Sequence, residues 1–467
     1  KNRQYRQSNT VDAMGQASGG TFVFCRHDFT EEGADESDLC YGCTCSHLVD
    51  GLENDSRSDW KDYPTKLREM IRSQDMTPDS SESSEECCTE KRSRHWFVPS
   101  MLADTKVAPD ICSKVRPGMA EVFKNLKVDQ GKRAVAVLSV YEARTGKRVS
   151  FKEQEFEVLF ADDQDCSRDE MLTWLEDYGM GWVCKKGLKA GSPNQDNFSA
   201  LVVEDDFILI GVYDGHGPNG HFVSQYTSHR MMELVASHRK RSTDIEAALR
   251  DCFKQCQRRI EKKMQVDARD SGTTSTVLYV DLVKQTLTVA HVGDTRCALG
   301  KFKDDVVEAE DLTVDHKPNL PEERRRIESA VPPGRVIFDG MANYRVFAQD
   351  TAYPGLNMSR ALGDLLAHRI AGISGVPDTT TVDLSELLAK YSKTGCLVCS
   401  DGVWEFMQAS YVYDFIADDL KDNVAYALNR LALEAWDKWM KDSDGEVSDD
   451  ITAVYLDINK ALSMNKK

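Results

Sequence analysis

The chain has 467 residues, 41% of them apolar, which is enough for one large domain or two ordinary domains with a packed core. Its formal net charge of −18 argues against nucleic-acid binding, which needs a basic face, and against attachment to anionic lipids. No stretch approaches the roughly 18 consecutive apolar residues of a transmembrane helix, so we expect no membrane span.

The N-terminal part of the chain has an unusual composition. Residues 30–38 are acidic, and residues 78–90 are rich in Ser and Glu. Such stretches bury too little apolar surface to offset the entropy that is lost on ordering. We therefore predict that residues 1–92 form a mainly disordered extension.

The same extension contains Cys and His residues that could ligate zinc, although their spacing matches no common zinc finger. These residues are Cys25, His27, Cys40, Cys43, Cys45 and His47. We favour the interpretation that they are scattered loop residues, and a zinc-dependent interaction module is the alternative.

Residues 93–165 are predicted to be a partly ordered extension with one β-hairpin beside the main domain. Val135 and Val137 begin an apolar alternation, Thr145-Gly146 is a turn signal, and residues 158–160 are again strand-like.

Sharper patterns begin near residue 181, and we place the main domain at residues 166–462, followed by a tail at 463–467. Short apolar runs predict strands at 207–213, 276–281, 286–292, 396–400 and 452–457. Helical periodicity predicts helices at 222–240, 244–264, 322–329 and 424–440. Hairpin-like strand pairs mixed with long helices favour an α+β fold over an alternating parallel sheet.

Several Asp residues stand where a predicted strand meets a polar or Gly-rich turn. They are Asp196, Asp214, Asp294, Asp401, Asp449 and Asp450. Carboxylates gathered at one sheet rim repel one another unless a cation bridges them, and all-oxygen ligation suits Mg²⁺ or Mn²⁺. Because Asp and Gly also dominate ordinary turns, the sequence spacing leaves both interpretations open for each residue on its own.

Eight short motifs follow one another between residues 181 and 456. They are Asn194-Gln195-Asp196-Asn197, Tyr213-Asp214-Gly215-His216-Gly217, Ser271-Gly272-Thr273-Thr274, Val292-Gly293-Asp294-Thr295-Arg296, Asp315-His316-Lys317-Pro318, Ser359-Arg360-Ala361-Leu362-Gly363-Asp364, Ser400-Asp401-Gly402-Val403-Trp404-Glu405 and Ser448-Asp449-Asp450-Ile451-Thr452. In this order they resemble the motif series of the metal-dependent protein phosphatases, the type 2C or PPM family. Residues 1 to about 165 carry no resemblance of this kind.

The resemblance implies two central antiparallel β-sheets packed face to face and flanked by α-helices, an αββα sandwich with metals between the sheets at one edge. It implies two Mg²⁺ or Mn²⁺ ions. Asp294 and Asp401 match positions that hold a third, weaker metal in some members.

The resemblance also implies the metal ligands. Asp214 would bridge both metals, with the Gly215 carbonyl on one of them. Asp401 and Asp449 would hold the first metal directly, and Asp196 would act from an outer position or through water.

The chemistry implied by the resemblance is hydrolysis by a metal-bridging water, whose pKa the two cations lower. Asp214 is catalytic in this sense, and His216 is the candidate general acid for the leaving Ser or Thr alkoxide. Without the resemblance, His216 would be interpreted as a hydrogen-bonded turn residue.

Many members of the family carry an Arg shortly before the first acidic motif, where it binds the substrate phosphate, but residues 184–193 contain no Arg. Lys189 is our first candidate for this role and Lys186 our second. A Lys supplies a point charge but lacks the bidentate fork of Arg.

Three further patterns are interpreted as structural. Cys252 and Arg258 have the spacing of cysteine-based phosphatases, but no Gly lies between them, and helical periodicity places Cys252 and Cys256 on a buried helix face. Residues 442–445 resemble the start of a calcium loop that lacks its distal Glu. Residues 322–326 are interpreted as a solvated helix face, with recruitment of acidic phosphoprotein segments as the alternative.

The sequence therefore predicts a metal-dependent protein serine/threonine phosphatase that acts on phosphoprotein substrates. A catalytically weak or silent scaffold with the same fold is the alternative, because the phosphate-binding Arg is missing. We expect a monomer without nucleic-acid partners. The 14 cysteines, several of them inside apolar patterns, favour free thiols and a cytoplasmic or nuclear location. The chain begins at Lys1, so an upstream targeting sequence could be missing.

Overall fold

The fold is taken from a computed structural model that describes residues 121–124, 133–140, 151–160, 167–189, 192–265, 267–304, 306–340 and 342–464. The extension predicted at 1–92, the zinc candidates within it and the predicted Thr145-Gly146 turn lie outside these residues. Within the described ranges, no helix is long and apolar enough to cross a membrane.

The inner strands of the larger main sheet have side chains that are covered on both faces. Along β5 (Phe207–His216), Ile208 and Ile210 belong to one apolar cluster, whereas Phe207 and Leu209 belong to another. Each strand is antiparallel to its hydrogen-bonded neighbours. The main path runs β15 (Asp378–Asp383), β8 (Thr286–Val292), β7 (Ser275–Asp281), β5, β4 (Asp196–Val203), β1 (Ala134–Ser139) and β2 (Phe156–Phe160), and β6 (Gly272–Thr273) and β14 (Leu362–Gly363) branch from β5.

The smaller main sheet is antiparallel as well, and a third short sheet lies outside the sandwich. The smaller sheet runs β10 (Val306–Asp311), β9 (Arg296–Lys303), β16 (Lys393–Cys399), β17 (Ile451–Asp457) and β3 (Met180–Lys185). The third sheet runs β11 (Gly334–Phe338), β12 (Tyr344–Ala348) and β13 (Pro354–Leu356), and it packs on α7 (Pro321–Glu328) and α8 (Leu365–Ile370).

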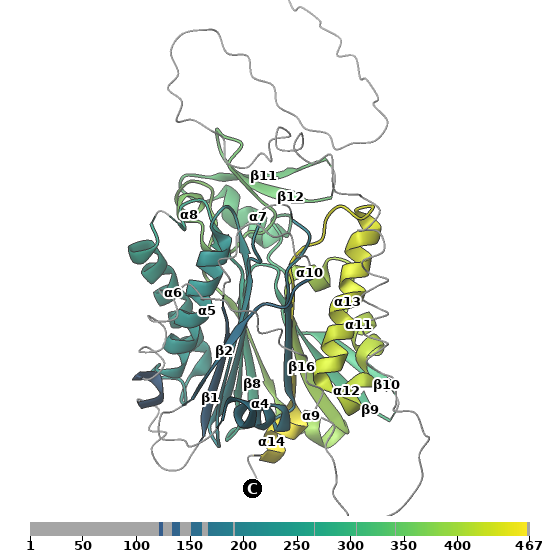
Figure 1. The fold of residues 1–467 in the computed structure, drawn as a ribbon. Coiled ribbons are helices and arrows are strands. Elements are labelled where there is room, and N and C mark those ends of the chain that lie inside the picture. The colour runs from purple at the N-terminus through teal and green to yellow at the C-terminus, as the bar shows by residue number, and fades with distance from the viewer. Residues whose placement is uncertain are drawn as a thin grey trace, which may run out of the picture. The chain divides into compact units, whose positions relative to one another are not determined.

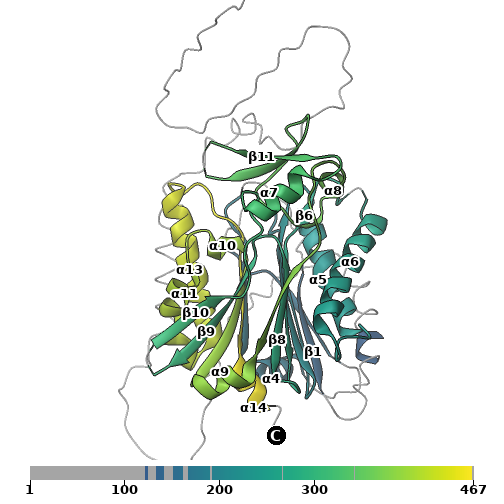
Figure 2. The same ribbon diagram turned by 180° about the vertical axis from the view of Figure 1, so that it is seen from behind.

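The two main sheets pack face to face through one apolar cluster. Phe198 and Val212 of the larger sheet meet Val398 and Val454 of the smaller sheet in this cluster. Figures 1 and 2 show the two sheets side by side, with helices on their outer faces.

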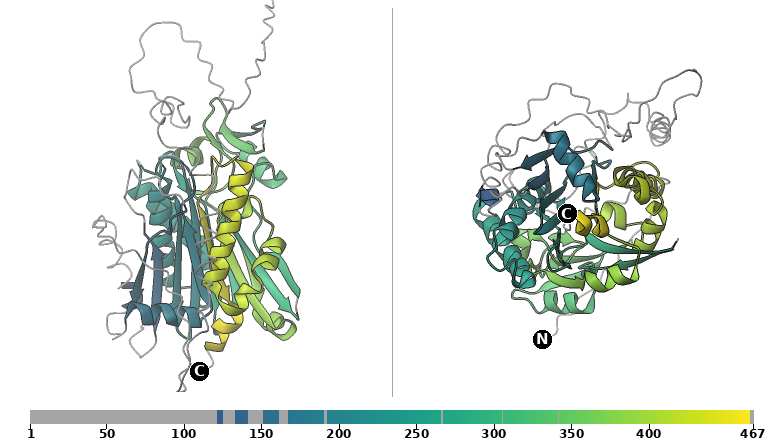
Figure 3. Two further views of the ribbon diagram at one scale, coloured as in Figure 1. Left: turned by 45° about the vertical axis from the view of Figure 1, so that its right-hand side comes forward. Right: turned by 90° about the horizontal axis from the view of Figure 1, so that it is seen from below.

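Helices cover the outer face of each main sheet. On the larger sheet these are α5 (Gly220–Ala236) and α6 (Ile245–Lys263). On the smaller sheet they are α11 (Ala409–Ile416) and α13 (Val424–Asp442), and α13 is the long yellow helix of Figure 3. Shorter helices are α4 (Arg168–Asp177), α9 (Leu384–Lys390), α10 (Asp401–Trp404), α12 (Asp419–Asp422) and α14 (Ile458–Met464).

This arrangement confirms the predicted α+β fold with two face-to-face antiparallel sheets flanked by helices. The strands predicted at 207–213, 276–281 and 286–292 lie in β5, β7 and β8. The helix predicted at 222–240 ends earlier, at Ala236, and residues 237–240 continue as turns. Cys252 and Cys256 lie on the buried face of α6, as the periodicity predicted.

The strands near residues 135 and 158 were predicted as a hairpin beside the main domain, but they are part of its larger sheet. β1 and β2 pair with each other, and β1 also pairs with β4 over five residue pairs from Ala134↔Val203 to Leu138↔Ser199. Both strands therefore belong to the larger main sheet.

Candidate metal centre

The predicted carboxylates lie where strands of both main sheets end at one edge. Asp196 begins β4 and is the register partner of Asp214, near the end of β5. Asp401 begins α10 shortly after β16, and Asp449 precedes β17, which pairs with β16. A direct contact joins the two sheets here, because the Ser400 hydroxyl donates to Asp196 Oδ2 at 2.7 Å.

The carboxylates raise one another's pKa values. Burial raises the pKa of Asp214 well above its ordinary value, and the charges of Asp401, Asp196 and Asp449 raise it further. Burial, followed by Asp449 and Asp294, raises the pKa of Asp401 to about 7. Asp214 and Asp401 also share a hydrogen bond, which requires a proton on one of them. This edge therefore holds more negative charge than its protein neighbours neutralise.

Two glycines allow the backbone to close around these carboxylates. A Cβ on Gly402 would lie 1.9 Å from the Asp450 carbonyl oxygen, and one on Gly215 would lie 2.6 Å from the Gln195 carbonyl oxygen. No side chain fits at either position, so each glycine lets its strand end come close to the next.

Asp449 and Asp450 are neighbours with different environments. Asp450 is 3% exposed, and its carboxylate accepts from the Gly187 and Gln195 amides at 2.7 and 2.8 Å. The carboxylate of Asp449 contacts the ammonium group of Lys189. Asp450 therefore fixes two loops, and Asp449 is the member of the pair that faces a cation.

Asp294 follows β8 and joins the same edge from the larger sheet. It is 1% exposed, and its Oδ2 accepts from Lys317 Nζ at 2.5 Å. Among the described residues, Oδ1 of Asp294 and Oδ1 of Asp401 are buried without a hydrogen-bond partner. Burying a carboxylate oxygen without a partner costs free energy, so both oxygens are suited to bind a cation.

The donor set fits a hard divalent cation. No three His, Cys, Asp or Glu side chains of the described residues converge as a preformed cage, and ammonium groups occupy two of the carboxylates instead. The Nζ atoms of Lys189 and Lys317 stand in for cations at Asp449 and Asp294. Only these two ammonium groups contact the six carboxylates within the described ranges, and oxygen ligands of this kind suit Mg²⁺ or Mn²⁺.

Lys189 and Lys186, the two candidates for binding the substrate phosphate, contact different groups. Lys189 is held on Asp449, and Lys186 Nζ donates to the Gly187 carbonyl at 3.1 Å. Burial lowers the pKa of Lys186, although the Asp450 charge opposes this. Both residues follow β3 at the carboxylate edge, and neither has the fork of an Arg.

His216 ends β5 and pairs with a carboxylate that was not assigned a role from the sequence. Its Nε2 lies 2.7 Å from Oδ2 of Asp364, which is 2% exposed. Burial alone would lower the pKa of His216, but the charge and hydrogen bond of Asp364 raise it above its ordinary value. Nδ1 is buried without a partner among the described residues, so one ring nitrogen is held and the other is available.

Three hydroxyl and carboxyl groups that support the site were missed by the sequence reasoning. Ser400 holds Asp196, and Asp364 holds His216. The Thr274 hydroxyl accepts from the Asp214 amide at 3.0 Å and thereby fixes the end of β5. All three lie inside the quoted motifs, which were the only available signal.

The interpretation of residues 322–326 as a solvated helix face is wrong for two of its members, Glu323 and Arg326. Glu323 is 4% exposed and accepts from Arg326, Ser359 and Arg360. Arg326 also donates to the Gly372 carbonyl at 2.6 Å. The first turn of α7 therefore takes part in a buried polar contact through Glu323, and its charged sequence gave no sign of this contact.

Comparisons with known proteins identify related sequences. Residues 184–443 match the family model described as protein phosphatase 2C. "Probable protein phosphatase 2C 34" of Arabidopsis thaliana is 31% identical over 281 residues, covering 56% of this chain and 75% of that protein. "Probable protein phosphatase 2C 61" of the same plant is 32% identical over 259 residues, covering 54% and 76%.

A solved structure supports the fold alone. A C. elegans sex determining protein superposes with a TM-score of 0.50 at 21% identity, covering 62% of this chain and 67% of that chain.

Proposed function

The chain belongs to the protein phosphatase 2C family, and we propose that it hydrolyses phosphoserine and phosphothreonine in proteins at a binuclear Mg²⁺ or Mn²⁺ centre. The observation that carries the proposal is the meeting of Asp214, Asp401 and Asp449 at one edge, with raised pKa values at Asp214 and Asp401. Carboxylates of this kind lower their energy by binding cations.

The metals would be held by the carboxylates at the sheet edge. Asp214 would bridge two ions, with the Gly215 carbonyl on one of them, and Asp401 and Asp449 would bind the first ion. Asp196 is held by Ser400, which suits an outer position. When bound, the ions would lower the pKa of a water and stabilise the charge of the phosphoryl oxygens.

A third, weaker cation would be held between Asp294 and Asp401. Each of these residues has one buried oxygen without a hydrogen-bond partner among the described residues. Lys317 contacts the other oxygen of Asp294, so this ammonium would compete with such an ion.

Lys189 and Lys186 would bind the substrate phosphate. Lys189, whose ammonium contacts Asp449, would bind the phosphate from the edge of the site. An ammonium binds phosphate oxygens as a point charge, with less control of orientation than an Arg fork.

His216 would protonate the leaving Ser or Thr alkoxide. Asp364 accepts from Nε2 and thereby orients the ring, so Nδ1 is the atom that would deliver the proton. Asp364 would act as a positioning residue, because it acts through His216.

The phosphatase domain would extend further towards the N-terminus than residue 166, because β1 and β2 are strands of its larger sheet. The protein would act on phosphoproteins as a monomer in the cytoplasm or nucleus.

The test is hydrolysis of a phosphoserine peptide by the full chain, with Mn²⁺ and after chelation. We expect turnover that requires the metal and that Asp214→Asn abolishes, while Asp442→Asn at the exposed end of α13 leaves it unchanged. Turnover that survives chelation would contradict the proposal. Calorimetric Mn²⁺ binding without turnover would favour the silent scaffold that the missing Arg suggests.

A further inference from the structure

The outer surface of α6 carries a stripe of basic side chains. The buried side of the helix includes Leu249 and Phe253, and on the opposite side Arg250, Lys254, Arg258 and Lys262 are exposed at four-residue spacing. Residues four apart lie next to each other along a helix, so these four form one stripe. We call this set the α6 stripe.

The region around the α6 stripe is basic although the whole chain is acidic. Residues 229–263 contain ten Lys and Arg residues and five Asp and Glu residues, in a chain of net charge −18. Several of these acids already have partners: Glu233 pairs with Arg230 and Arg259, and Asp251 pairs with His238.

Three residues of the α6 stripe have no such partner. Lys254, Arg258 and Lys262 form no ion pair with any residue in the described part of the chain. Arg250 is the exception, since it pairs with Glu246 one turn earlier. The stripe therefore presents positive charge that the folded domain does not neutralise.

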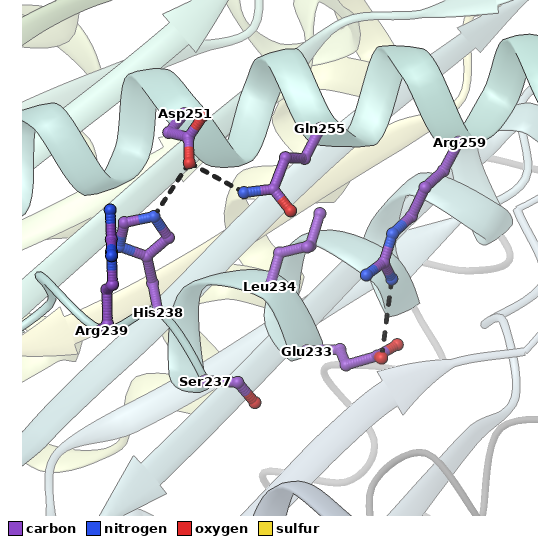
Figure 4. Close-up of a pocket in the computed structure, with 8 residues that line it drawn as sticks. All are labelled: Glu233, Leu234, Ser237, His238, Arg239, Asp251, Gln255 and Arg259. Carbon is purple, nitrogen blue, oxygen red and sulfur yellow. Dashed lines mark hydrogen bonds and ion pairs between the residues drawn. The ribbon is translucent and has the colours of Figure 1, made fainter.

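A groove of about 500 Å³ lies beside the stripe, between α6 and the end of α5. Figure 4 shows Arg239 and Glu233 of the α5 side facing Asp251, Gln255 and Arg259 of α6. The groove lies at the far end of α5 from Gly220, which packs against Gly215 of the metal centre. A helix of 17 residues separates the two sites, or roughly 25 Å.

The chain contains an acidic segment on the N-terminal side of the described residues. Residues 75–90 include six Asp and Glu residues and no Lys or Arg. Val122 and Phe123 are buried in the same apolar cluster as Leu249 and Phe253 of α6, so the chain enters the domain beside this helix (Figure 1).

The tether is long enough to reach the stripe. Residues 91–120 separate the acidic segment from the short helical segment at residues 121–124, and thirty residues span up to about 100 Å. The 19 residues of α6 cover only about 28 Å. The tether also keeps the segment at high local concentration, which favours a weak contact.

We propose that residues 75–90 of this chain dock on the α6 stripe and the groove beside it. Six negative charges meet a surface on which Lys254, Arg258 and Lys262 have no ion-pair partner among the described residues, and this attraction requires no single conformation of the segment. The contact is sensitive to salt, because both partners are exposed to solvent. Phosphorylation of Ser80, Ser81, Ser83 or Ser84 would add charge of the same sign and strengthen it. The inference does not depend on the proposed catalytic activity.

Carbodiimide cross-linking of the full chain tests the proposal, because this reagent joins carboxylates directly to Lys amines. At low salt we expect cross-links from residues 75–90 to Lys254, Lys262 and Lys263, identified by mass spectrometry. Cross-links to Lys262 and Lys263 should fall about fivefold in the Lys254→Glu, Arg258→Glu variant and in 0.5 M salt.

Two comparisons separate docking from general charge effects. Lys421→Glu with Lys441→Glu changes the net charge equally at the exposed surface of α12 and α13, and it should leave the cross-links unchanged. Glu82→Gln, Glu85→Gln and Glu86→Gln should weaken the cross-links that remain from Asp75, Asp79 and Glu90, without altering the folded domain.

Two results would overturn the proposal. One is cross-linking that is equal in the α6 variant and the Lys421, Lys441 control. The other is cross-links that join two chains in a mixture of ¹⁴N- and ¹⁵N-labelled protein, which would assign the surface to a second copy.

Discussion

Carboxylates are buried in two regions of the molecule, and their pKa values shift in opposite directions. At the metal centre, burial and neighbouring acids raise the pKa values of Asp214 and Asp401. Beneath α7, burial alone would raise the pKa of Glu323, but hydrogen bonds from Arg360, Arg326 and Ser359 lower it to about 2.

The difference lies in the partners that each region provides. Glu323 is surrounded by the guanidinium groups of Arg326 and Arg360, and Arg360 also pairs with Asp378. The charges under α7 are therefore balanced within the chain. The candidate metal centre gathers acids from both sheets, and among the described residues only the ammonium groups of Lys189 and Lys317 contact them, so this region is suited to bind ions from solution.

Substitution of a carboxylate at the candidate metal centre should have the largest effect. Asp401→Asn should lower kcat/KM about 10³-fold, or roughly 4 kcal/mol, because it removes a carboxylate that we propose as a direct metal ligand. In metal-free protein the same change should raise the free energy of unfolding, since it removes one of several mutually repelling carboxylates.

Both quantities are measurable on one preparation, by peptide hydrolysis with Mn²⁺ and by urea unfolding in chelator. Asp442→Asn is the matched control, and it should change neither value. If Asp401→Asn instead lowers the free energy of unfolding of the metal-free protein, the carboxylates at this edge do not repel one another as inferred.

The balanced region should respond in the opposite way. Glu323→Gln leaves the guanidinium groups of Arg360 and Arg326 without a carboxylate, which should lower the free energy of unfolding by about 3 kcal/mol. The adjacent exposed Glu322→Gln should change it by less than about 0.5 kcal/mol.

The stabilising effect of Glu323 should depend on pH. Its pKa lies below the ordinary value of 4.5, so its contribution to stability is present above pH 4.5 and is lost as the pH falls towards about 2. The stability gap between the wild type and Glu323→Gln should therefore narrow below pH 4.5 in urea titrations. A gap that widens there would show that Glu323 is not the stabilising partner.

The smallest effect is expected for His216 and Asp364, which pair with each other beside the carboxylates of the candidate metal centre. Asp364→Asn should lower kcat about tenfold, or about 1.4 kcal/mol, on a phosphoserine peptide, because the ring is no longer held. The loss should be smaller on p-nitrophenyl phosphate, whose leaving group needs no proton. Equal losses on the two substrates would argue for a purely structural role of Asp364.

The sequence predicted the elements whose signal is local. Continuous apolar runs located β5, β7 and β8, and the series of motifs located Asp214 and Asp401 at strand ends. The α7 contact could not be predicted in this way, because Glu323 meets residues about 36 positions away and its neighbours Glu322 and Arg324 are exposed. A charged pattern does not distinguish a solvated side chain from one that tertiary contacts bury.

The predicted site was incomplete for the same reason. Ser400 and Asp364 act on Asp196 and His216 across large sequence separations, and a Ser or Asp at a strand end otherwise reads as a turn residue. The choice between Lys189 and Lys186 depends on which ammonium faces the substrate when metal is bound, and this stays a prediction.

The strand β1 has a practical consequence for shortening the chain. It covers β4 along Ser199–Val203, and a fragment that begins at residue 166 would leave the backbone N–H and C=O groups of this apolar strand open to solvent. Exposed strand edges of this kind recruit other chains and cause aggregation. A fragment for expression and crystallisation should therefore begin before Ala134. If a shorter fragment is insoluble, the cause would be the exposed edge of β4 and not low stability of the remaining domain.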